Sequence, residues 1–391
     1  MSTDAETFLR LLLAALEEQL PSAVGLRERL HSKPELAHAE HETSAAVAEA
    51  LAALPVERVA GTGLLVRMSG AAGGAVALRA ELDALPVREE TGAPFAAGGD
   101  AMHACGHDVH SAALVAVLRA VGGLRDALPR PFVALFQPSE EAYPSGAVEL
   151  VEAGALNGVE TVAAVHVHPD VPWGAVAVDD GSVNASSDTF TIVVHGRSGH
   201  AAYPHRASDP VVASAAVVVA AQTLVSRRLD PLRSAVVTFG ALRAGSVENV
   251  IPNEARALGT LRALDPDDRL FLRRELDALV GHVAAAHGCT ARVEWTEGEP
   301  AIVNDPELVA SARPLLASAG LEHASALRSC GADDFGFFSA SARLLLLFAG
   351  IRGAPGTAHF PLHHPRFLPP NEAVAVVART QAVALAAASF V

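Results

Sequence analysis

The chain has few of several residue types, and each shortage excludes a class of protein. Lys33 is the only lysine among 391 residues, and 29 basic side chains stand against 44 acidic ones, for a net charge of −15. This acid excess argues against a general binder of nucleic acid, which needs a basic surface. Three cysteines do not make a disulfide framework and are typical of a reducing compartment. Half of the residues are hydrophobic and 19% are charged, which excludes a disordered protein.

Long hydrophobic runs are also scarce. The apolar run at residues 11–16 follows Asp4 and Glu6 rather than basic residues, so it predicts an amphipathic first helix and not a signal peptide. The run of alanine and valine at residues 211–221 is too short to span a bilayer. The sequence therefore predicts a cytoplasmic protein that has no membrane partner.

The length of 391 residues predicts about two domains. In the first part of the chain, helical patterns alternate with short apolar strands such as residues 132–136, which indicates an α/β domain with a mostly parallel sheet. Further on, the order becomes strand–helix–strand–strand–helix–strand, the split βαβ arrangement of an α+β domain. We therefore expect an α/β domain made of residues 1–184 and 298–391, with an α+β domain of residues 185–297 inserted in it.

Histidine is abundant, with 17 residues, and short segments concentrate it with other ligand types. The densest segment, residues 102–110, holds three histidines, a cysteine and an aspartate, and its imidazole and thiolate groups are ligands for first-row transition metals. Glu140 and Glu141 follow an apolar strand. His166 lies at the end of another strand, and a His-His pair begins at His363. Ligands bind at strand ends in α/β sheets, so these segments together predict a di-metal hydrolase site.

The order of these segments resembles the M20 metallopeptidase family. Within it, the resemblance is to the amidohydrolase branch, which includes hippurate hydrolases, N-acyl-amino-acid amidohydrolases and auxin-conjugate hydrolases. The segments that carry it run almost from end to end: RAELDALP at 79–86, MHACGHDVH at 102–110, FQPSEE at 136–141, GHA at 199–201, NVIP at 249–252, GTLR at 259–262 and LH at 362–363. The family fold is a metal-binding α/β domain with an inserted satellite domain that usually dimerises, in agreement with the insertion inferred above.

The resemblance implies a metal centre with a base beside it. Two divalent ions, of manganese, zinc, cobalt or nickel, would be held by five ligands, namely Cys105, His107, Glu141, His166 and His363. Glu140 would be the general base, which takes a proton from water held by the ions and passes it to the departing amine. Asp83 would orient one of the ligands.

The resemblance also implies roles for residues of the inserted domain. His200 would reach a partner subunit's active site and polarise the scissile carbonyl. Asn249 and Arg262 would hold the α-carboxylate of the substrate, a task that suits the planar fork of arginine. The protein would then be a homodimer joined through the inserted domain.

Four positions depart from the family pattern. Glu81 stands where aspartate is usual, and Asp333 stands where glutamate is usual. His168 comes two residues after one expected ligand, and His364 comes directly after another, where a small polar residue is usual. These changes keep charge or ligand type, but they leave open which histidine of each pair is the ligand.

We expect the protein to hydrolyse the amide bond of a small N-acyl amino acid. Alternatives within the same family are a dipeptidase, an N-acetyl-diaminopimelate deacetylase and an N-carbamoyl hydrolase. An alternative of another class is a non-catalytic binding protein on the same fold. The cysteine in the densest segment favours the acyl-amino-acid branch, and the presence of Glu140 and all five candidate ligands argues against a binding protein that has lost its chemistry.

Overall fold

The computed structural model describes residues 3–391, which form two compact units, each with its own hydrophobic core. The larger unit extends to Gly181 and also contains Val303–Leu327 and Phe337–Val391. The smaller unit consists of Ser182–Ile302 and Arg328–Gly336. The second of these segments lies in sequence that we had assigned to the α/β domain.

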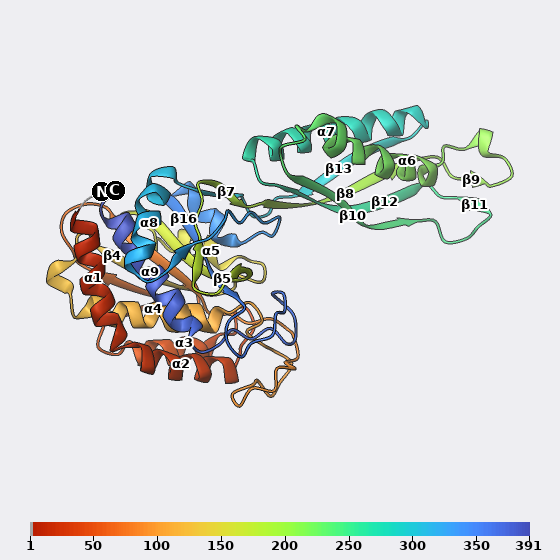
Figure 1. Cartoon of the computed structure of the whole chain (residues 1–391). Helices are drawn as coiled ribbons and strands as arrows, with labels where there is room; N and C mark the ends of the chain where they lie inside the picture. The colour runs from red at the N-terminus through yellow and green to blue at the C-terminus, as the bar shows by residue number, and fades with distance from the viewer. Residues whose placement is uncertain (1–2) are drawn as a thin grey trace. The chain divides into compact units, whose positions relative to one another are not determined.

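A mostly parallel sheet forms the centre of the larger unit (Figure 1). Its main strands lie in the order β1-β2-β4-β3-β5-β16, and the pairs β4-β3, β3-β5 and β5-β16 are parallel. These pairs confirm the predicted α/β class. The strands and their bounds are β1 (Val56–Val59), β2 (Gly63–Met68), β3 (Ala75–Glu81), β4 (Phe132–Gln137), β5 (Val159–Pro172), β6 (Ala175–Ala177), β14 (Ile302–Asn304), β15 (Glu322–His323) and β16 (Arg343–Arg352). All but the first residue of the short strand β7 (Gly181–Asn184) belong to the smaller unit.

Two apolar helices, α4 and α9, pack on this sheet, and α1 and α2 pack on those helices in turn. Nearly every residue of α9 is buried, as expected of a helix that is apolar on all sides. The helices of this unit are α1 (Thr3–Glu17), α2 (Leu20–Ser32), α3 (His41–Ala50), α4 (His107–Gly122), α5 (Gly146–Glu152), α8 (Pro306–Ser318) and α9 (Ala373–Ser389).

The smaller unit is a four-stranded antiparallel sheet with two helices on one face (Figure 1). Its strands β8 (Ser186–His195), β10 (Ala235–Ala244), β12 (Glu254–Ala263) and β13 (Thr290–Thr296) lie in the order β10-β12-β8-β13. The helices are α6 (Pro210–Thr223) and α7 (Pro266–Ala286), and β9 (Gly199–His200) pairs with β11 (Val250–Ile251) in a separate ribbon. Both helices begin at an Asp-Pro pair: the aspartates Asp209 and Asp265 accept backbone N–H groups, and proline suits the first helical position.

One helix is longer than the sequence led us to expect. After α6 the chain continues in a π-helical turn to Arg228, so the apolar helix Pro210–Arg228 has 19 residues and meets the length and composition of a membrane span. Ala213, Val217 and Ala221 lie in the core of the smaller unit, and a third of the helix is buried. A core helix that packs on a sheet has the same length and composition, so this feature alone does not indicate a membrane.

Candidate metal centre

Within the segment of residues 102–110, the chain turns at Gly106, a position that requires glycine. Gly106 has a φ of +85° and directly precedes α4, which begins at His107. A Cβ at this position would lie 2.5 Å from Cγ2 of Val167 on β5, so a side chain there would be both strained and blocked. The turn therefore brings Cys105 and His107 against the end of β5.

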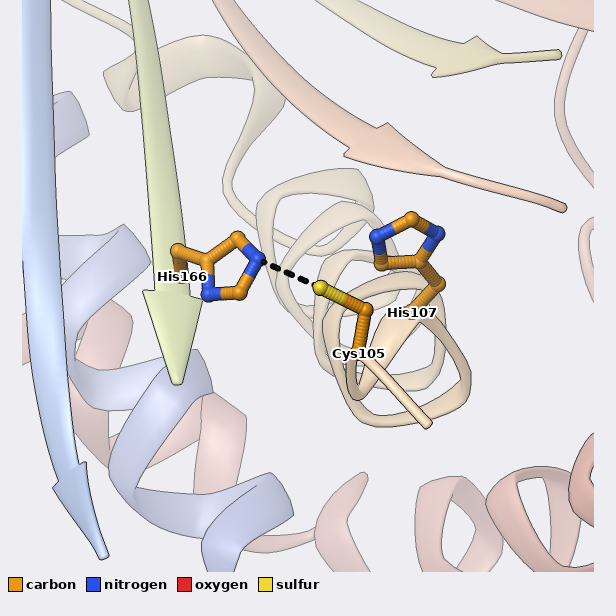
Figure 2. Close-up of side chains that lie close together, drawn as sticks. All are labelled: Cys105, His107 and His166. Atoms are coloured by element: carbon orange, nitrogen blue, oxygen red, sulfur yellow. Dashed lines mark hydrogen bonds between the residues drawn. The ribbon is translucent and has the colours of Figure 1, made fainter. Parts of the chain in front are cut away.

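Cys105, His107 and His166 converge at this point, as Figure 2 shows. Sγ of Cys105 lies 3.4 Å from Nε2 of His166, and the rings of His107 and His166 meet at an angle of 87° with their centres 6.2 Å apart. One ligand atom from each of the three residues lies within 4.8 Å of the others, a spacing that one metal ion can close. All three side chains are buried or nearly so.

Hydrogen bonds fix the two rings with the same nitrogen facing inward. Nδ1 of His107 donates to the backbone carbonyl of Asp83 at 2.9 Å, and Nδ1 of His166 donates to the carbonyl of Val167 at 2.6 Å. Each ring therefore turns Nε2 toward the site, the orientation that metal-binding histidines have. Among residues 3–391, Nε2 of His107 is buried and has no hydrogen-bond partner.

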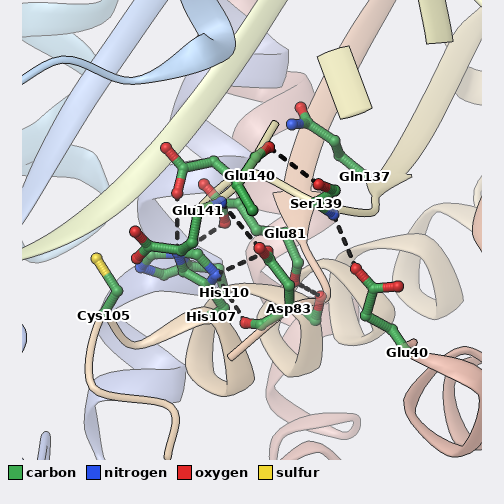
Figure 3. A network of polar contacts seen from close by, with 12 residues as sticks. Glu40, Glu81, Asp83, Cys105, His107, His110, Gln137, Ser139, Glu140 and Glu141 are labelled. Atoms are coloured by element: carbon green, nitrogen blue, oxygen red, sulfur yellow. Dashed lines mark hydrogen bonds and ion pairs between the residues drawn. The ribbon is translucent and has the colours of Figure 1, made fainter. Parts of the chain in front are cut away.

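Two glutamates, seen in Figure 3, and a histidine from a distant segment complete the group. Glu140 and Glu141 follow β4, and Asp83 accepts the backbone N–H of Glu141 at 2.9 Å. Oε2 of Glu140 lies 3.8 Å from Nε2 of His107, and Oε1 of Glu141 lies 3.3 Å from Nε2 of His363. Ligand atoms of Cys105, Glu141 and His363 also fall within 4.8 Å of one another, so the thiol of Cys105 belongs to two candidate ion sites.

The structure separates the members of each histidine pair. His363 has a φ of +64°, and its N–H donates to the carbonyl of Ala104, which directs the side chain toward the cluster. His364 instead stacks on Phe360 with ring centres 4.6 Å apart. His168 lies outside the candidate groups: its Nδ1 accepts the N–H of Asp170.

The charge of the cluster fits divalent cations. Burial raises the pKa of the Cys105 thiol well above its usual value, and the carboxylates of Glu141 and Glu140 raise it further. Burial lowers the pKa of His107, but nearby carboxylates, above all Glu81, outweigh this effect and raise it to about 10. Without a cation, the thiol and the imidazole therefore keep protons to balance the acids. Metal ions replace such protons, because thiolate and neutral imidazole are the forms that bind them.

Three predicted residues lie in the smaller unit. His200 is exposed on β9, where its Nδ1 accepts the N–H of Ala202. Asn249 is exposed beside β11, and its carbonyl accepts the N–H of Ala201. Arg262 on β12 is partly exposed and donates from Nη1 to the carbonyl of Cys330 at 3.1 Å. The roles predicted for these residues stay predictions.

Sequence reasoning missed a buried carboxylate that holds the turn of the two glutamates. Glu40 accepts the N–H of Ser139 at 2.8 Å and the hydroxyl of Thr62 at 2.6 Å. Ser139 directly precedes Glu140 and has a φ of +47°, which is unusual for a side chain other than glycine. No local pattern marks Glu40, because Ser139 is 99 residues away in the chain.

A buried ion network behind the cluster was missed as well. Asp108, next to His107, accepts from Nε of Arg27 at 2.8 Å and from Nδ1 of His31 at 2.9 Å. Burial lowers the pKa of His31, but Asp108 outweighs this effect and raises it to about 9. One signal was available, since Arg27 and His31 are four residues apart and so share a face of α2.

The chain resembles known proteins in both sequence and structure. The sequence profile of peptidase family M20/M25/M40 matches residues 77–386. The chain belongs to this family. The M20 chain is 35% identical over 360 residues to an N-acetyl-L-cysteine deacetylase of Bacillus subtilis. The aligned region covers 91% of this chain and 84% of that protein. It is 33% identical over 372 residues to an N-acetyldiaminopimelate deacetylase of Bacillus licheniformis, with 92% and 97% covered.

Solved structures of the family agree. An aminohydrolase of methicillin-resistant Staphylococcus aureus matches with a TM-score of 0.91 and 30% identity, over 96% of this chain and 98% of that one. A dinuclear metal-binding M20 peptidase of Bacillus subtilis matches with a TM-score of 0.84 and 29% identity, over 95% and 98%. The resemblance noted in the sequence is thus confirmed. The M20 protein is a metal-dependent hydrolase of amide bonds.

Proposed function

We propose that this M20 protein hydrolyses N-acyl amino acids, releasing a carboxylic acid and a free amino acid. The observation that carries the proposal is the convergence of ligand atoms from Cys105, His107, Glu141, His166 and His363, with the Glu140 carboxylate 3.8 Å from Nε2 of His107. These residues come from four separate parts of the chain, and folding brings their ligand atoms together. Two divalent ions suit this mixed set of nitrogen, oxygen and sulfur donors.

The residues around the ions divide the work. Bound divalent cations supply Lewis acidity and lower the pKa of water. Glu140 accepts a proton from the water that attacks the amide carbon and delivers it to the nitrogen of the leaving amine. Asp83 accepts the backbone N–H of Glu141 and, through its backbone carbonyl, the Nδ1–H of His107. It therefore keeps the glutamate turn and His107 in one fixed arrangement.

The residues of the smaller unit supply substrate contacts in this proposal. The guanidinium of Arg262 binds the α-carboxylate of the amino acid, because a planar fork can form two charge-assisted hydrogen bonds with a carboxylate. Asn249 contributes a further hydrogen bond to the same group, and His200 from a partner subunit polarises the scissile carbonyl. The names of two relatives, deacetylases of N-acetyl-L-cysteine and N-acetyldiaminopimelate, support an N-acyl amino acid as the substrate class.

We further propose that two copies associate through the smaller unit. Strand β10 is an edge of its sheet, and α6 lies beside it. Val212 on α6 is 53% exposed, Val219 is 72% exposed, and Leu242 on β10 is 47% exposed. An unpaired edge next to apolar side chains favours pairing with a second chain. Analytical ultracentrifugation tests this: Val219→Glu should shift a dimer to monomers, and a wild-type monomer would contradict the proposal.

The predicted cytoplasmic location stays a prediction.

One alternative has support of its own. Two relatives from Saccharolobus solfataricus, each 33% identical over 354 residues, are thermostable carboxypeptidases, so a peptide substrate is the second candidate. An N-acyl amino acid and a dipeptide have the same amide and carboxylate, and they differ in the free amine of the dipeptide. The two candidates can therefore be compared on one enzyme preparation.

The test is a hydrolysis panel after reconstitution with manganese, zinc, cobalt or nickel. N-acetyl, N-benzoyl and N-carbamoyl derivatives of several amino acids are compared with the matching dipeptides, and release of the free amino acid is measured. We expect the highest kcat/KM on an N-acyl amino acid. A preference for dipeptides would assign the peptidase function, and no turnover with any metal would contradict both candidates.

A further inference from the structure

His110 is a completely buried histidine, one helical turn after His107 on α4, and both of its ring nitrogens are occupied. Nε2 accepts the backbone N–H of Val167 at 2.9 Å, and Nδ1 lies 2.8 Å from Oε2 of Glu81. Because a peptide N–H can only donate, Nε2 carries no hydrogen, and the hydrogen on Nδ1 is donated to Glu81. His110 therefore has no lone pair to offer a metal ion, although its ligand atom lies within 4.8 Å of those of Glu81 and His107.

Glu81, which accepts the hydrogen bond from Nδ1 of His110, has further buried partners of its own. Its carboxylate contacts the buried guanidinium of Arg79, whose Nε donates to the side chain of Gln137 at 2.8 Å. Its backbone carbonyl accepts the hydroxyl of Ser111 at 2.6 Å. Glu81 therefore links the end of β3 to α4 and fixes the direction of the His110 ring.

His110 binds the N–H of Val167 at a position of β5 that β3 no longer reaches. The pairing of β3 with β5 ends at Arg79 and Ala164, three residues before Val167. A buried backbone N–H without a partner costs free energy, so a side chain must replace the missing strand. His110 supplies that acceptor (Figure 3 shows its position among the polar side chains).

The same backbone segment sets the ring of His166. The carbonyl of Val167 accepts from Nδ1 of His166, while the N–H of Val167 is held by His110. The His110 ring also packs edge-on against the His166 ring, with centres 4.6 Å apart. With its Nδ1 and its ring plane both fixed, His166 can only direct Nε2 toward Sγ of Cys105.

We propose that Glu81 and His110 form a positioning pair, which sets the angle of the His166 ring through the Val167 backbone and binds neither metal nor substrate. This inference rests on the proposed role of His166 as a ligand. It predicts a selective effect. Of the two candidate groups that contain Cys105, only the group with His107 and His166 depends on the pair, while the group with Glu141 and His363 does not.

Two substitutions separate the two nitrogens of His110. In His110→Asn, the amide nitrogen can replace Nδ1 and keep the bond to Glu81, but nothing reaches Val167. In His110→Gln, the longer side chain can place its amide oxygen near the position of Nε2 and accept the Val167 N–H. Loss of a residue that orients a metal ligand typically weakens metal binding about 10- to 100-fold. We expect His110→Asn to show this loss at one ion site and His110→Gln to restore most of the affinity.

The measurement is a titration of the metal-free protein with Co²⁺, followed by the absorption of the cobalt–thiolate bond and by isothermal titration calorimetry. His168→Asn is the matched control, since His168 lies on β5, the strand of His166 and Val167, but outside the cluster. This variant should bind two ions as the wild type does. Thermal unfolding of each variant, measured by circular dichroism, reports any general loss of folding.

The outcomes decide between the possible roles. One weakened site and one unchanged site in His110→Asn, with recovery in His110→Gln, supports the positioning pair. Equal weakening of both sites, or equal loss in both variants, overturns it, because a general structural role has that result. If His166→Ala itself leaves Co²⁺ binding unchanged, His166 is not a ligand and the metal centre of the proposed function is wrong. That result differs from a failure of the positioning pair alone, in which His166→Ala loses an ion and His110→Asn does not.

Discussion

The metal cluster and the predicted substrate residues differ in how their side chains are held. In the larger unit, His107 and His166 are buried and each has a fixed partner for Nδ1. In the smaller unit, His200 and Asn249 are exposed to solvent. A buried polar group must be paired in the folded chain, because leaving it without a partner costs about 1–3 kcal/mol. An exposed group can exchange a bond within the chain for one with water, so folding fixes its direction less strictly.

This difference indicates what orients the candidate metal ligands and what orients the predicted substrate-binding residues. Hydrogen bonds within the chain orient the rings of the two candidate ligands His107 and His166 in the larger unit. In the smaller unit, the exposed His200 has a local contact, the N–H of Ala202, and we expect a substrate or a second subunit to complete its position. Substitutions in the cluster should therefore change metal content and turnover, whereas substitutions in the smaller unit should mainly change substrate affinity.

The largest effect is expected at the histidine pair near the end of the chain. His363→Ala removes a predicted ligand, so it should abolish turnover and reduce the metal content measured by plasma mass spectrometry. His364→Ala, the matched control, removes a ring that stacks on Phe360 and should have a smaller effect. The reverse result would show that the wrong histidine has been assigned.

The second effect is expected at the base. Glu140→Gln keeps the shape of the side chain but removes its ability to accept a proton, so kcat should fall about 10²- to 10⁴-fold while both ions stay bound. The exposed Glu152→Gln on α5 is the control and should leave kcat unchanged. An unchanged kcat in Glu140→Gln, or a loss of metal with it, would contradict its role as the general base.

A smaller effect, and one on substrate affinity, is expected in the other unit. Arg262→Gln removes a charged fork, and a hydrogen bond to a charged group contributes about 1.5–3 kcal/mol, so KM should rise at least about tenfold with kcat nearly unchanged. Arg256→Gln on the same strand is the control. The KM for an N-acyl amino acid amide, which has no α-carboxylate, should not change in Arg262→Gln. A fall in kcat without a change in KM would remove the proposed distinction between the units.

The last effect concerns stability and its pH dependence rather than activity, in the buried network of Arg27, His31 and Asp108. The pKa of His31 is about 9 in the folded chain, above its ordinary value of 6.5, because Asp108 outweighs the effect of burial. A raised pKa stabilises the fold fully below pH 6.5, and this contribution, about 3 kcal/mol, is lost as the pH rises through 9. Denaturant unfolding of the wild type and of His31→Gln is measured at pH 6 and at pH 9.5. The free energy of unfolding should decrease more between these pH values in the wild type than in the variant. Equal decreases would contradict a charged His31.

The fold and most of the cluster could be predicted because their signals are local. Buried strands such as β4 read as short apolar runs, and the ligand types cluster in segments of a few residues. The alternation of a strand, however, puts His166 and His168 on the same face, so the pattern could not choose between them. In the folded chain, Nε2 of His166 lies near Sγ of Cys105, whereas Nδ1 of His168 accepts the N–H of Asp170, and this difference favours His166.

The sequence by itself determined the ligand types, their order along the chain and hence the family. Only the tertiary structure decided which nitrogen of each ring faces inward, which member of each histidine pair joins the cluster, and which buried carboxylates hold them. The reason is physical. Residue type and periodicity are properties of a short segment, but the partner of a ring nitrogen or a buried carboxylate comes from elsewhere in the chain, as Asp83 does for His107 and Glu40 does for Ser139.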